Sequence, residues 1–385
     1  MKYLYAFAFA LLFCCSSVFA QVHTKDSLQA YTLFLQKQNT TAKDYILNLF
    51  TKYDIVILCE RDHREITQYN LICDILADTR FSCEVGAIYC EIGNMAYNKA
   101  INRFLQDDTL SPDEVEQGIL TFHRNIYGAS LWEKANYSYL LQRVHAINKN
   151  LGNNKIEVFG LERGVNWDTA TQADILRRNV STDATFRDAV LAENFINYYR
   201  YSRTGKALII LNYRHAFMQD IAGRCNAGRY ICDTYGDRVA NVYINSFSLA
   251  PDGTVQAAHE GLWDAAFAME QKDNIGFDLV NTPFGNASFD MIPFATTLTY
   301  AQVFTGMVYY THFTQLRIVQ GMPNFVDDEF AREMQRRYRL EGNIPPDIET
   351  LKQRYNRVID RTYQEEFPAA TKQVELWVKM IMINE

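Results

Sequence analysis

The sequence predicts an α/β protein with a mostly parallel central sheet, helices on both faces of the sheet, and additional C-terminal helices. Short apolar runs alternate with segments of helical periodicity over the first two-thirds of the chain. Strands that are apolar throughout, without alternation, are typical of a parallel sheet that is covered on both faces. The composition agrees, because 48% hydrophobic and 14% aromatic residues can form a large core and argue against disorder.

Five strands are predicted before residue 250, and helices are predicted between them. The strands cover residues 54–60, 85–91, 155–162, 206–215 and 239–245. Apolar residues at helical spacing predict helices over 28–38, 43–53, 64–79, 95–106, 112–122, 130–148 and 168–203. The pattern is less regular after residue 250, where short strands are expected near 276–279 and 307–310. Charged amphipathic segments at 327–340 and 347–382 predict two helices that pack over the sheet or its mouth.

The first twenty residues are predicted to be a secretory signal peptide. Lys2 precedes an apolar stretch that ends in VFA at 18–20, which resembles a small-x-Ala cleavage site. This stretch is too short and wrongly flanked for a membrane span. We favour cleavage after Ala20 over lipoprotein anchoring at Cys14, because Phe13 is not the small residue expected there. The mature protein is therefore expected to be exported, to the periplasm or the extracellular space.

The mature chain, residues 21–385, is expected to form a single domain with a helical C-terminal elaboration from about residue 320. No Pro/Gly/Ser-rich linker and no repeat of fixed period divides it.

The formal net charge is −7, or −8 without Lys2, and there is no block of Lys and Arg, which argues against a nucleic-acid partner. No further apolar stretch reaches the length of about 18 residues that predicts an integral membrane span. A small-molecule substrate is the expected partner.

Six cysteines remain after the first twenty residues. Cys225 and Cys232 bracket the polar, glycine-containing segment NAGRYI, and export makes a disulfide between them permissible. We predict this disulfide, with two free thiols as the alternative interpretation. Pairs of the CxxC kind are absent from the sequence, which argues against a structural zinc site.

Ionisable residues follow four of the predicted strands, at the edge where a parallel sheet usually binds ligands. A single Glu at a strand end is commonly a helix cap or a first-turn charge, and a single His is commonly structural. Four strands that deliver such groups to one edge instead indicate a functional site. The candidates are Glu60, Arg61, Asp62, His63 and Glu65 after the first strand, Glu91 after the second, Glu162 and Arg163 after the third, and Arg214 and His215 after the fourth.

These residues carry a resemblance to the erythromycin esterase-like family. ERDH at 60–63 resembles the Glu-x-x-His turn of that family, VGAIYCE its second strand with Glu91 at the acidic position, and LIILNYRHAF the strand that ends in its second essential histidine, here His215. KIEVFGLE resembles a later strand. The wider superfamily includes haem-binding iron-regulated lipoproteins and TraB/Tiki-type metalloproteases. The resemblance spans about residues 50–250, with departures at Cys59 and Arg64, where the family has Gly, and at Asn212, where it often has His.

The first hypothesis is a hydrolase that needs no cofactor, and the resemblance implies an ester or lactone as the bond that it cleaves. His63 would be the general base, oriented by Glu60, which would also raise its pKa. His215 would be a second base, an acid or an oxyanion partner, and Glu91 would steady one of the histidines or bind substrate. Positive charge for an oxyanion would come from Arg163 or Arg214. Arg61, Glu65 and Glu162 complete the candidates for substrate binding.

Two further hypotheses remain open from the sequence. In one, Glu60, His63, Glu91 and His215 bind a divalent ion such as Zn²⁺ or Mn²⁺ for metal-assisted hydrolysis, as in the Tiki-like relatives. In the other, the scaffold is a non-catalytic binding protein. Its aromatic stretches at 196–201 and 307–313 would then line a pocket for haem, a glycan or a lipid, with His312 as a candidate haem ligand. Packing in the core is the competing interpretation of both aromatic stretches.

Overall fold

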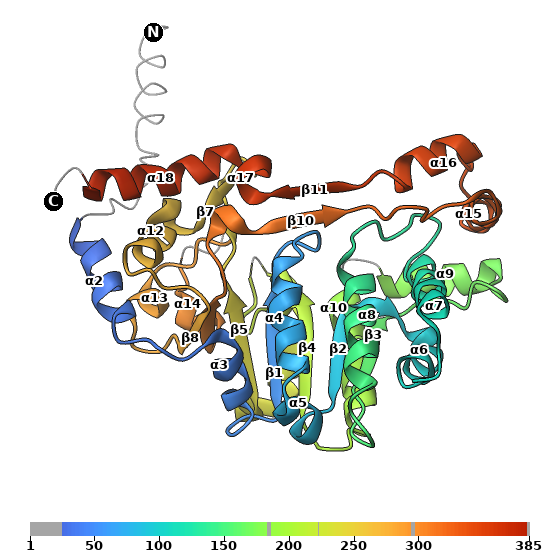
Figure 1. Ribbon diagram of the computed structural model, residues 1–385, viewed down its shortest axis with the longest axis horizontal. Coiled ribbons are helices and arrows are strands. Elements are labelled where there is room, and N and C mark those ends of the chain that lie inside the picture. The colour runs from blue at the N-terminus through green and yellow to red at the C-terminus, as the bar shows by residue number, and fades with distance from the viewer. Residues whose placement is uncertain (1–24, 183–185, 222, 294–296, 383–385) are drawn as a thin grey trace, which may run out of the picture.

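The computed structural model describes residues 25–182, 186–221, 223–293 and 297–382, and its centre is a seven-stranded sheet (Figure 1). The predicted signal peptide lies outside the described residues. The strand order is β3 (Glu157–Glu162), β2 (Ala87–Asn94), β4 (Ala207–Asn212), β1 (Ile55–Glu60), β5 (Val239–Ile244), β9 (Gly306–Tyr309) and β8 (Ile275–Asp278). All neighbouring strands pair in parallel except β8 and β9. The predicted α/β fold with a mostly parallel sheet is confirmed.

Strand β1 lies at the centre and is buried along its whole length. Its register places Ile57 between Ile209 of β4 and Asn241 of β5. The chain leaves β1 for β2 and β3 on one side, returns through β4, and continues to β5 on the other side. The direction in which the sheet is built therefore reverses beside β1, which is where open parallel sheets form ligand crevices.

Each face of the sheet has its own core, as the alternation along β1 requires. Ile55, Ile57 and Cys59 belong to one core, whereas Val56 and Leu58 belong to the other. The first face is covered by α2 (Lys25–Leu35), α10 (Arg187–Tyr199), α11 (Ala227–Tyr235), α12 (Leu262–Met269), α13 (Pro283–Asn286) and α14 (Tyr300–Val303). The second is covered by α3 (Ala42–Leu49), α4 (Thr67–Leu76), α5 (Thr79–Glu84), α6 (Asn98–Leu105), α7 (Pro112–Arg124) and α8 (Asn136–Asn148).

Two long predicted helices are divided in the structure. The segment 168–203 forms α9 (Gln172–Thr182) and then α10, so that Arg187 begins a new helix. The segment 347–382 forms α16 (Ile348–Tyr355), strand β11 (Ile359–Thr362), α17 (Tyr363–Glu366) and α18 (Pro368–Met382). The helical expectation was wrong for β11 because its backbone pairs with β10 (Arg317–Gln320), a tertiary contact that periodicity does not report. The remaining C-terminal helix, α15 (Asp328–Leu340), forms as predicted, and β6 (Phe247–Leu249) pairs with β7 (Val255–Ala257) in a separate small sheet.

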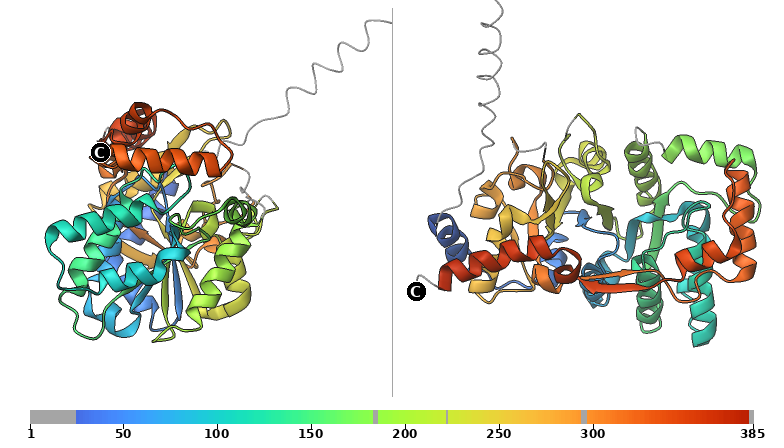
Figure 2. Two further views of the ribbon diagram at one scale, coloured as in Figure 1. Left: turned by 90° about the vertical axis from the view of Figure 1, so that its right-hand side faces the viewer. Right: turned by 90° about the horizontal axis from the view of Figure 1, so that it is seen from above.

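The antiparallel ribbon β10–β11 crosses the end of the central sheet at which the parallel strands finish (Figure 1). Viewed from above, it joins α15 and α16 at one end of the molecule to α17 and α18 at the other (Figure 2). The free edge of β10 binds the loop after β1: Ile66 N donates to Arg317 O at 2.8 Å, and Val319 N donates to Arg64 O at 2.8 Å. The ribbon therefore fixes the loop that carries His63.

The predicted disulfide between Cys225 and Cys232 is absent, because both cysteines are free thiols. The segment expected to be a loop forms α11, which begins at Ala227 and contains Cys232. A helix rises about 1.5 Å per residue, so Cys232 is carried away from Cys225 and packs against the core. Burial raises the pKa of Cys232 to about 11. In the described ranges, no helix combines the length and apolar composition that crossing a membrane requires.

The ribbon makes a measurable contribution to stability. Ile318 of β10 has no exposed surface and packs with Leu316 and Tyr363 in a small core of its own. We expect Ile318→Ala to lower the free energy of unfolding by about 2–4 kcal/mol, because the lost methyl groups leave a cavity. The control is Arg317→Ala at the preceding, 55% exposed position, which should cost at most about 1 kcal/mol. Urea denaturation of both variants would check this, and equal losses would contradict a packing role for the ribbon.

Candidate active site

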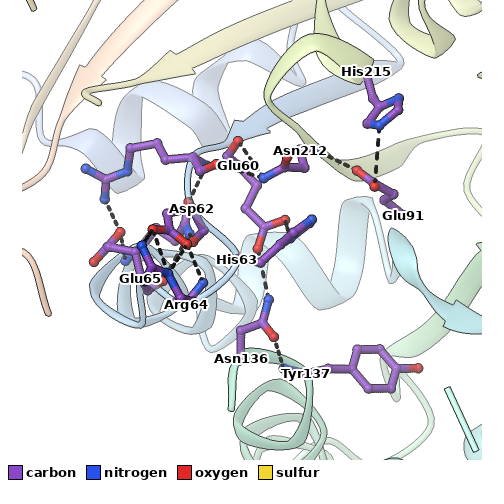
Figure 3. Close-up of polar contacts among 12 residues, drawn as sticks. Glu60, Asp62, His63, Arg64, Glu65, Glu91, Asn136, Tyr137, Asn212 and His215 are labelled. Atoms are coloured by element: carbon purple, nitrogen blue, oxygen red, sulfur yellow. Dashed lines mark hydrogen bonds and ion pairs between the residues drawn. The ribbon is translucent and has the colours of Figure 1, made fainter. Parts of the chain in front are cut away.

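Residues from four adjacent strands, β3, β2, β4 and β1, come together at the end of the sheet beneath the ribbon. Glu60 and His63 face each other on one side of this cluster, and Glu91 and His215 lie together on the other (Figure 3). Glu162 joins the second group through a shared arginine. The structure therefore assembles Glu60, His63, Glu91, Glu162 and His215 in one place.

Glu60 and His63 form a pair held by a buried polar network. Glu60 ends β1 and is 1% exposed. Its Oε1 accepts hydrogen bonds from Tyr69 Oη at 2.8 Å and Asn136 Nδ2 at 2.9 Å. Its Oε2 lies 2.7 Å from His63 Nδ1. This contact occupies Nδ1, and no residue within the described chain hydrogen-bonds Nε2 of His63, which leaves Nε2 as the nitrogen for a substrate or water.

The environment of His63 favours its protonated form. The side chain is 21% exposed, and its ring meets Trp132 edge-on at 4.7 Å between centroids. Burial by itself would lower the pKa of His63, but the negative charge and contact of Glu60, with a smaller effect from Glu91, raise the pKa above its usual value. The imidazole is thus oriented and made more basic by the same carboxylate.

His215 forms the second imidazole–carboxylate pair. It lies in the 3₁₀ turn η2 (Tyr213–Ala216) directly after β4. Nδ1 is 2.6 Å from Asp188 Oδ1, and Nε2 is 2.8 Å from Arg187 Nη1. A guanidinium can only donate hydrogen bonds, so in the neutral ring Nδ1 carries the proton and Nε2 accepts. Burial would raise the pKa of Asp188, but the hydrogen bond and charge of His215 lower it overall.

Arg187 connects the charged residues of three strands. Its Nη2 donates to Glu91 Oε1 at 2.8 Å and to Glu162 Oε2 at 2.7 Å, and its Nε donates to the same Glu162 oxygen at 2.9 Å. Burial alone would raise the pKa of Glu91, yet the charges of His215 and Arg187 hold it at about 2. For Glu162, burial outweighs Arg187 and raises the pKa. Arg187 is thus the cation around which this half of the cluster is built.

Sequence reasoning missed Arg187, Asp188, Tyr69 and Asn136. The first two begin α10, inside a segment predicted as one uninterrupted helix, so nothing marked them as residues at a helix start. Tyr69 and Asn136 lie on α4 and near the start of α8, and they reach Glu60 only through tertiary packing. A sequence signal exists for Arg187 and Asp188: an Arg-Asp pair follows the STDATF segment, whose Ser, Thr and Asp are typical of a helix boundary.

Two strands end at other residues than predicted: β2 ends at Asn94 instead of Glu91, and β4 ends at Asn212 instead of His215. Glu91 does not end its strand, because β2 continues to Asn94. The register between β2 and β3 shifts between Cys90 and Asn94, and such an irregularity re-aims side chains near sites. Asn212 ends β4. It donates from its backbone N to Glu91 Oε2 at 2.7 Å and from Nδ2 to Arg61 O at 2.7 Å.

Arg61 and Glu65, predicted to bind substrate, lie inside the protein. Both side chains have 0% exposed surface, and they form an ion pair with each other. Glu65 also accepts hydrogen bonds from the backbone N of Thr67 at 2.7 Å and of Gln68 at 3.2 Å at the start of α4. These contacts make the pair an anchor of the loop that carries His63, and a substrate outside the core does not reach them.

Arg163 and Arg214 lie at the rim of the cluster. Arg214 is 29% exposed and donates from Nη1 to Asp188 Oδ2 at 2.9 Å. Arg163 directly follows β3, is exposed, and lines a hollow that also includes Glu162. Both guanidinium groups are thus placed where a bound molecule could meet them, while Arg187 lies deeper, at 16% exposure.

The arrangement does not fit the metal hypothesis. Across the described ranges, no three His, Cys, Asp or Glu side chains are grouped so that they could hold a metal ion. Glu91, Glu162 and His215 instead direct their polar atoms at the guanidinium of Arg187. The guanidinium of Arg187, a permanent cation, already occupies the position between these three side chains. The proposed ligand set of Glu60, His63, Glu91 and His215 therefore divides into two imidazole–carboxylate groups.

Comparisons with known proteins show similarity of fold only. No protein-family model matches the chain, and no curated protein matches its sequence. A succinoglycan biosynthesis protein of solved structure is similar over 75% of this chain and 97% of its own, with a TM-score of 0.50 and 9% identity. A protein from Bacillus cereus has a TM-score of 0.43 and 12% identity over 73% and 96% of the two chains. An erythromycin esterase mutant in its open conformation has a TM-score of 0.46 and 11% identity over 74% and 95%.

Removing Arg187 should destabilise the protein strongly. We expect Arg187→Met to lower the free energy of unfolding by about 3–5 kcal/mol, because it leaves the buried carboxylates of Glu91 and Glu162 without the cation that they share. The control is Arg200→Met, which replaces the exposed arginine just after the same helix and should change stability by no more than about 0.5 kcal/mol. Guanidinium denaturation at neutral pH measures both, and a loss under 1 kcal/mol for Arg187→Met would refute its central role.

Proposed function

We propose that this protein is an exported hydrolase that cleaves an ester or lactone bond in a small molecule, with His63 as the general base. The observation that supports this most directly is the Glu60–His63 pair. The carboxylate contacts Nδ1, so that Nε2 is left unoccupied at the carboxyl edge of the sheet. An imidazole that is oriented by a buried carboxylate and exposes one basic nitrogen suits proton abstraction from water.

The chemistry can be followed through the groups present. His63 Nε2 takes a proton from water, the resulting hydroxide attacks the carbonyl carbon, and negative charge develops on the carbonyl oxygen. The guanidinium group of Arg214 supplies positive charge on the side of His215, where that oxyanion would be stabilised. When the tetrahedral intermediate collapses, the bond to the alkoxide oxygen breaks, and this oxygen takes from His63 the proton that came from water, which gives the alcohol. The reaction consumes one water molecule for each bond cleaved, and His63 returns to its neutral form.

The resemblance of ERDH at 60–63, of Glu91 and of His215 to erythromycin esterase-like motifs supports the same reaction class. Asn212 stands at a family histidine position, but its amide and backbone hold Arg61 and Glu91 in place. The two imidazole–carboxylate pairs needed for acid–base chemistry are thus present without a histidine at 212. Export is proposed from the N-terminal sequence alone, and the metal-dependent route is not proposed, because Arg187 lies where the ion would bind.

Replacing His63 tests the proposal. We expect His63→Gln to reduce kcat/KM on activated esters and lactones about 10²–10⁴-fold, the contribution of a positioned general base. The ring is partly exposed, so the variant should keep its melting temperature within a few degrees. His312→Gln is the matched control, since His312 is a half-buried histidine whose Nδ1 contacts Tyr309 Oη, outside the cluster. Unchanged turnover in His63→Gln, or a folded wild type that is inactive on every ester and lactone tried, would contradict the proposal.

The pH profile offers an independent check. A general base must be neutral, and the pKa of His63 is raised, so kcat/KM should increase with pH and level off only above the ordinary histidine pKa of about 6.5. Removing the carboxylate by Glu60→Gln leaves burial as the main effect, which lowers the pKa. The acid limb should therefore move to lower pH in this variant, while the plateau falls. A limb that does not move in Glu60→Gln would assign the titration to another group.

A further inference from the structure

Two adjoining hollows open beside Arg163, and the smaller one is also lined by Glu162. They share Arg163, Gly164 and Arg178, and the larger has a volume of about 370 Å³. We call them together the arginine pocket, which is lined among others by Tyr127, Glu162, Arg163, Gly164, Arg177 and Arg178. Because Glu162 also binds Arg187, the arginine pocket begins at the candidate active site and leads outward.

The acidic groups of the arginine pocket are already paired. Glu162 accepts hydrogen bonds from Arg187. Asp174 accepts from Thr171 N at 2.8 Å and forms an ion pair with Arg177. The charge of Asp174 is thus matched by Arg177, whereas Glu162 shares the single charge of Arg187 with Glu91.

The arginines of the pocket differ in their pairing with acidic groups. Arg178 donates from Nη2 to Glu341 Oε1 at 3.0 Å. Arg163 is exposed and, among the residues that the structure describes, has no hydrogen-bond or ion-pair partner. An exposed guanidinium just after a strand end, with its donors open, can bind a carboxylate or phosphate through two parallel hydrogen bonds.

Aromatic rings connect the arginine pocket to His63. The Tyr127 ring is 43% exposed and lines the smaller hollow. It lies 6.3 Å from the Trp132 ring, which in turn lies 4.7 Å from the His63 ring. A molecule that reaches from the pocket to His63 would therefore pass an apolar wall, with Arg163 at its far end.

We propose that the arginine pocket binds an anionic group of the substrate, a carboxylate or a phosphate, and that Arg163 is the specificity-determining residue. This inference rests on the proposed function and narrows its substrates to esters that carry a negative charge remote from the bond cleaved. Tyr127 and Trp132 contact the connecting part of the molecule, and Arg163 binds the anion by charge-assisted hydrogen bonds.

The test compares esters that differ only in the remote group. Mono-4-nitrophenyl glutarate carries a carboxylate, 4-nitrophenyl 4-phosphonobutanoate carries a phosphonate, and 4-nitrophenyl pentanoate is neutral. We expect Arg163→Gln to raise KM at least tenfold for the charged ester that the wild type prefers, with kcat retained and with the neutral ester changed less than twofold. Arg163→Lys should recover only part of the loss. Arg200→Gln is the matched control, an exposed arginine elsewhere, and should behave as wild type.

Binding measurements separate this inference from the hydrolase itself. Calorimetric titration would use the glutarate mono-anilide, its phosphonate counterpart and neutral pentananilide, whose amide bonds resist cleavage. If an anionic anilide binds to the wild type but no longer binds to Arg163→Gln, the result supports the pocket even when no ester is hydrolysed. The anionic anilide that binds more tightly identifies carboxylate or phosphate as the preferred group. Equal effects of Arg163→Gln on charged and neutral compounds, or no preference for charge in the wild type, would overturn the inference.

Discussion

The ion-pair cluster around Arg187 is the constraint on which the rest of the site depends. Strands β2 and β3 each bring a carboxylate into a nearly water-free position, and the turn after β4 adds His215. Carboxylates buried in this way carry a large desolvation cost unless a cation meets them with good geometry. One guanidinium, supplied by the first residue of α10, meets both carboxylates and the imidazole. The position of α10, the ionised state of Glu91 and the tautomer of His215 all follow from it.

The other half of the site is organised without a strong cation. Glu60 is satisfied by a phenol and an amide, Tyr69 and Asn136, which leaves its remaining oxygen to His63. The two histidines therefore differ: the lone pair of His215 is directed into Arg187, whereas Nε2 of His63 is open. The ribbon β10–β11 and the buried Arg61–Glu65 pair hold the His63 loop from both sides. This pre-organisation is what a base needs, because its orientation is then set before substrate binds.

Much of this could be anticipated from residue patterns, and particular elements show where that ends. The five strands before residue 250 and the edge on which Glu60, His63, Glu91 and His215 meet follow from apolar runs that stop at charged residues. The break between α9 and α10, strand β11 and helix α11, which contains Cys232, did not follow from the same patterns. Strand β11 forms because its backbone pairs with β10, and Arg187, the first residue of α10, is held by contacts with residues of other elements.

The sequence by itself determined which ionisable groups lie at strand ends and which edge of the sheet presents them, because apolar runs and strand ends are local properties of the chain. The tertiary structure alone decided how those groups are paired. Arg187 lies 96 residues from Glu91 and 28 from His215, and Asn136 lies 76 residues from Glu60. No sequence period encodes such contacts, since they arise from the packing of helices on the sheet. That packing divides the predicted cluster of Glu60, His63, Glu91 and His215 into two groups. Nε2 of His215 contacts Arg187, whereas Nε2 of His63 is open.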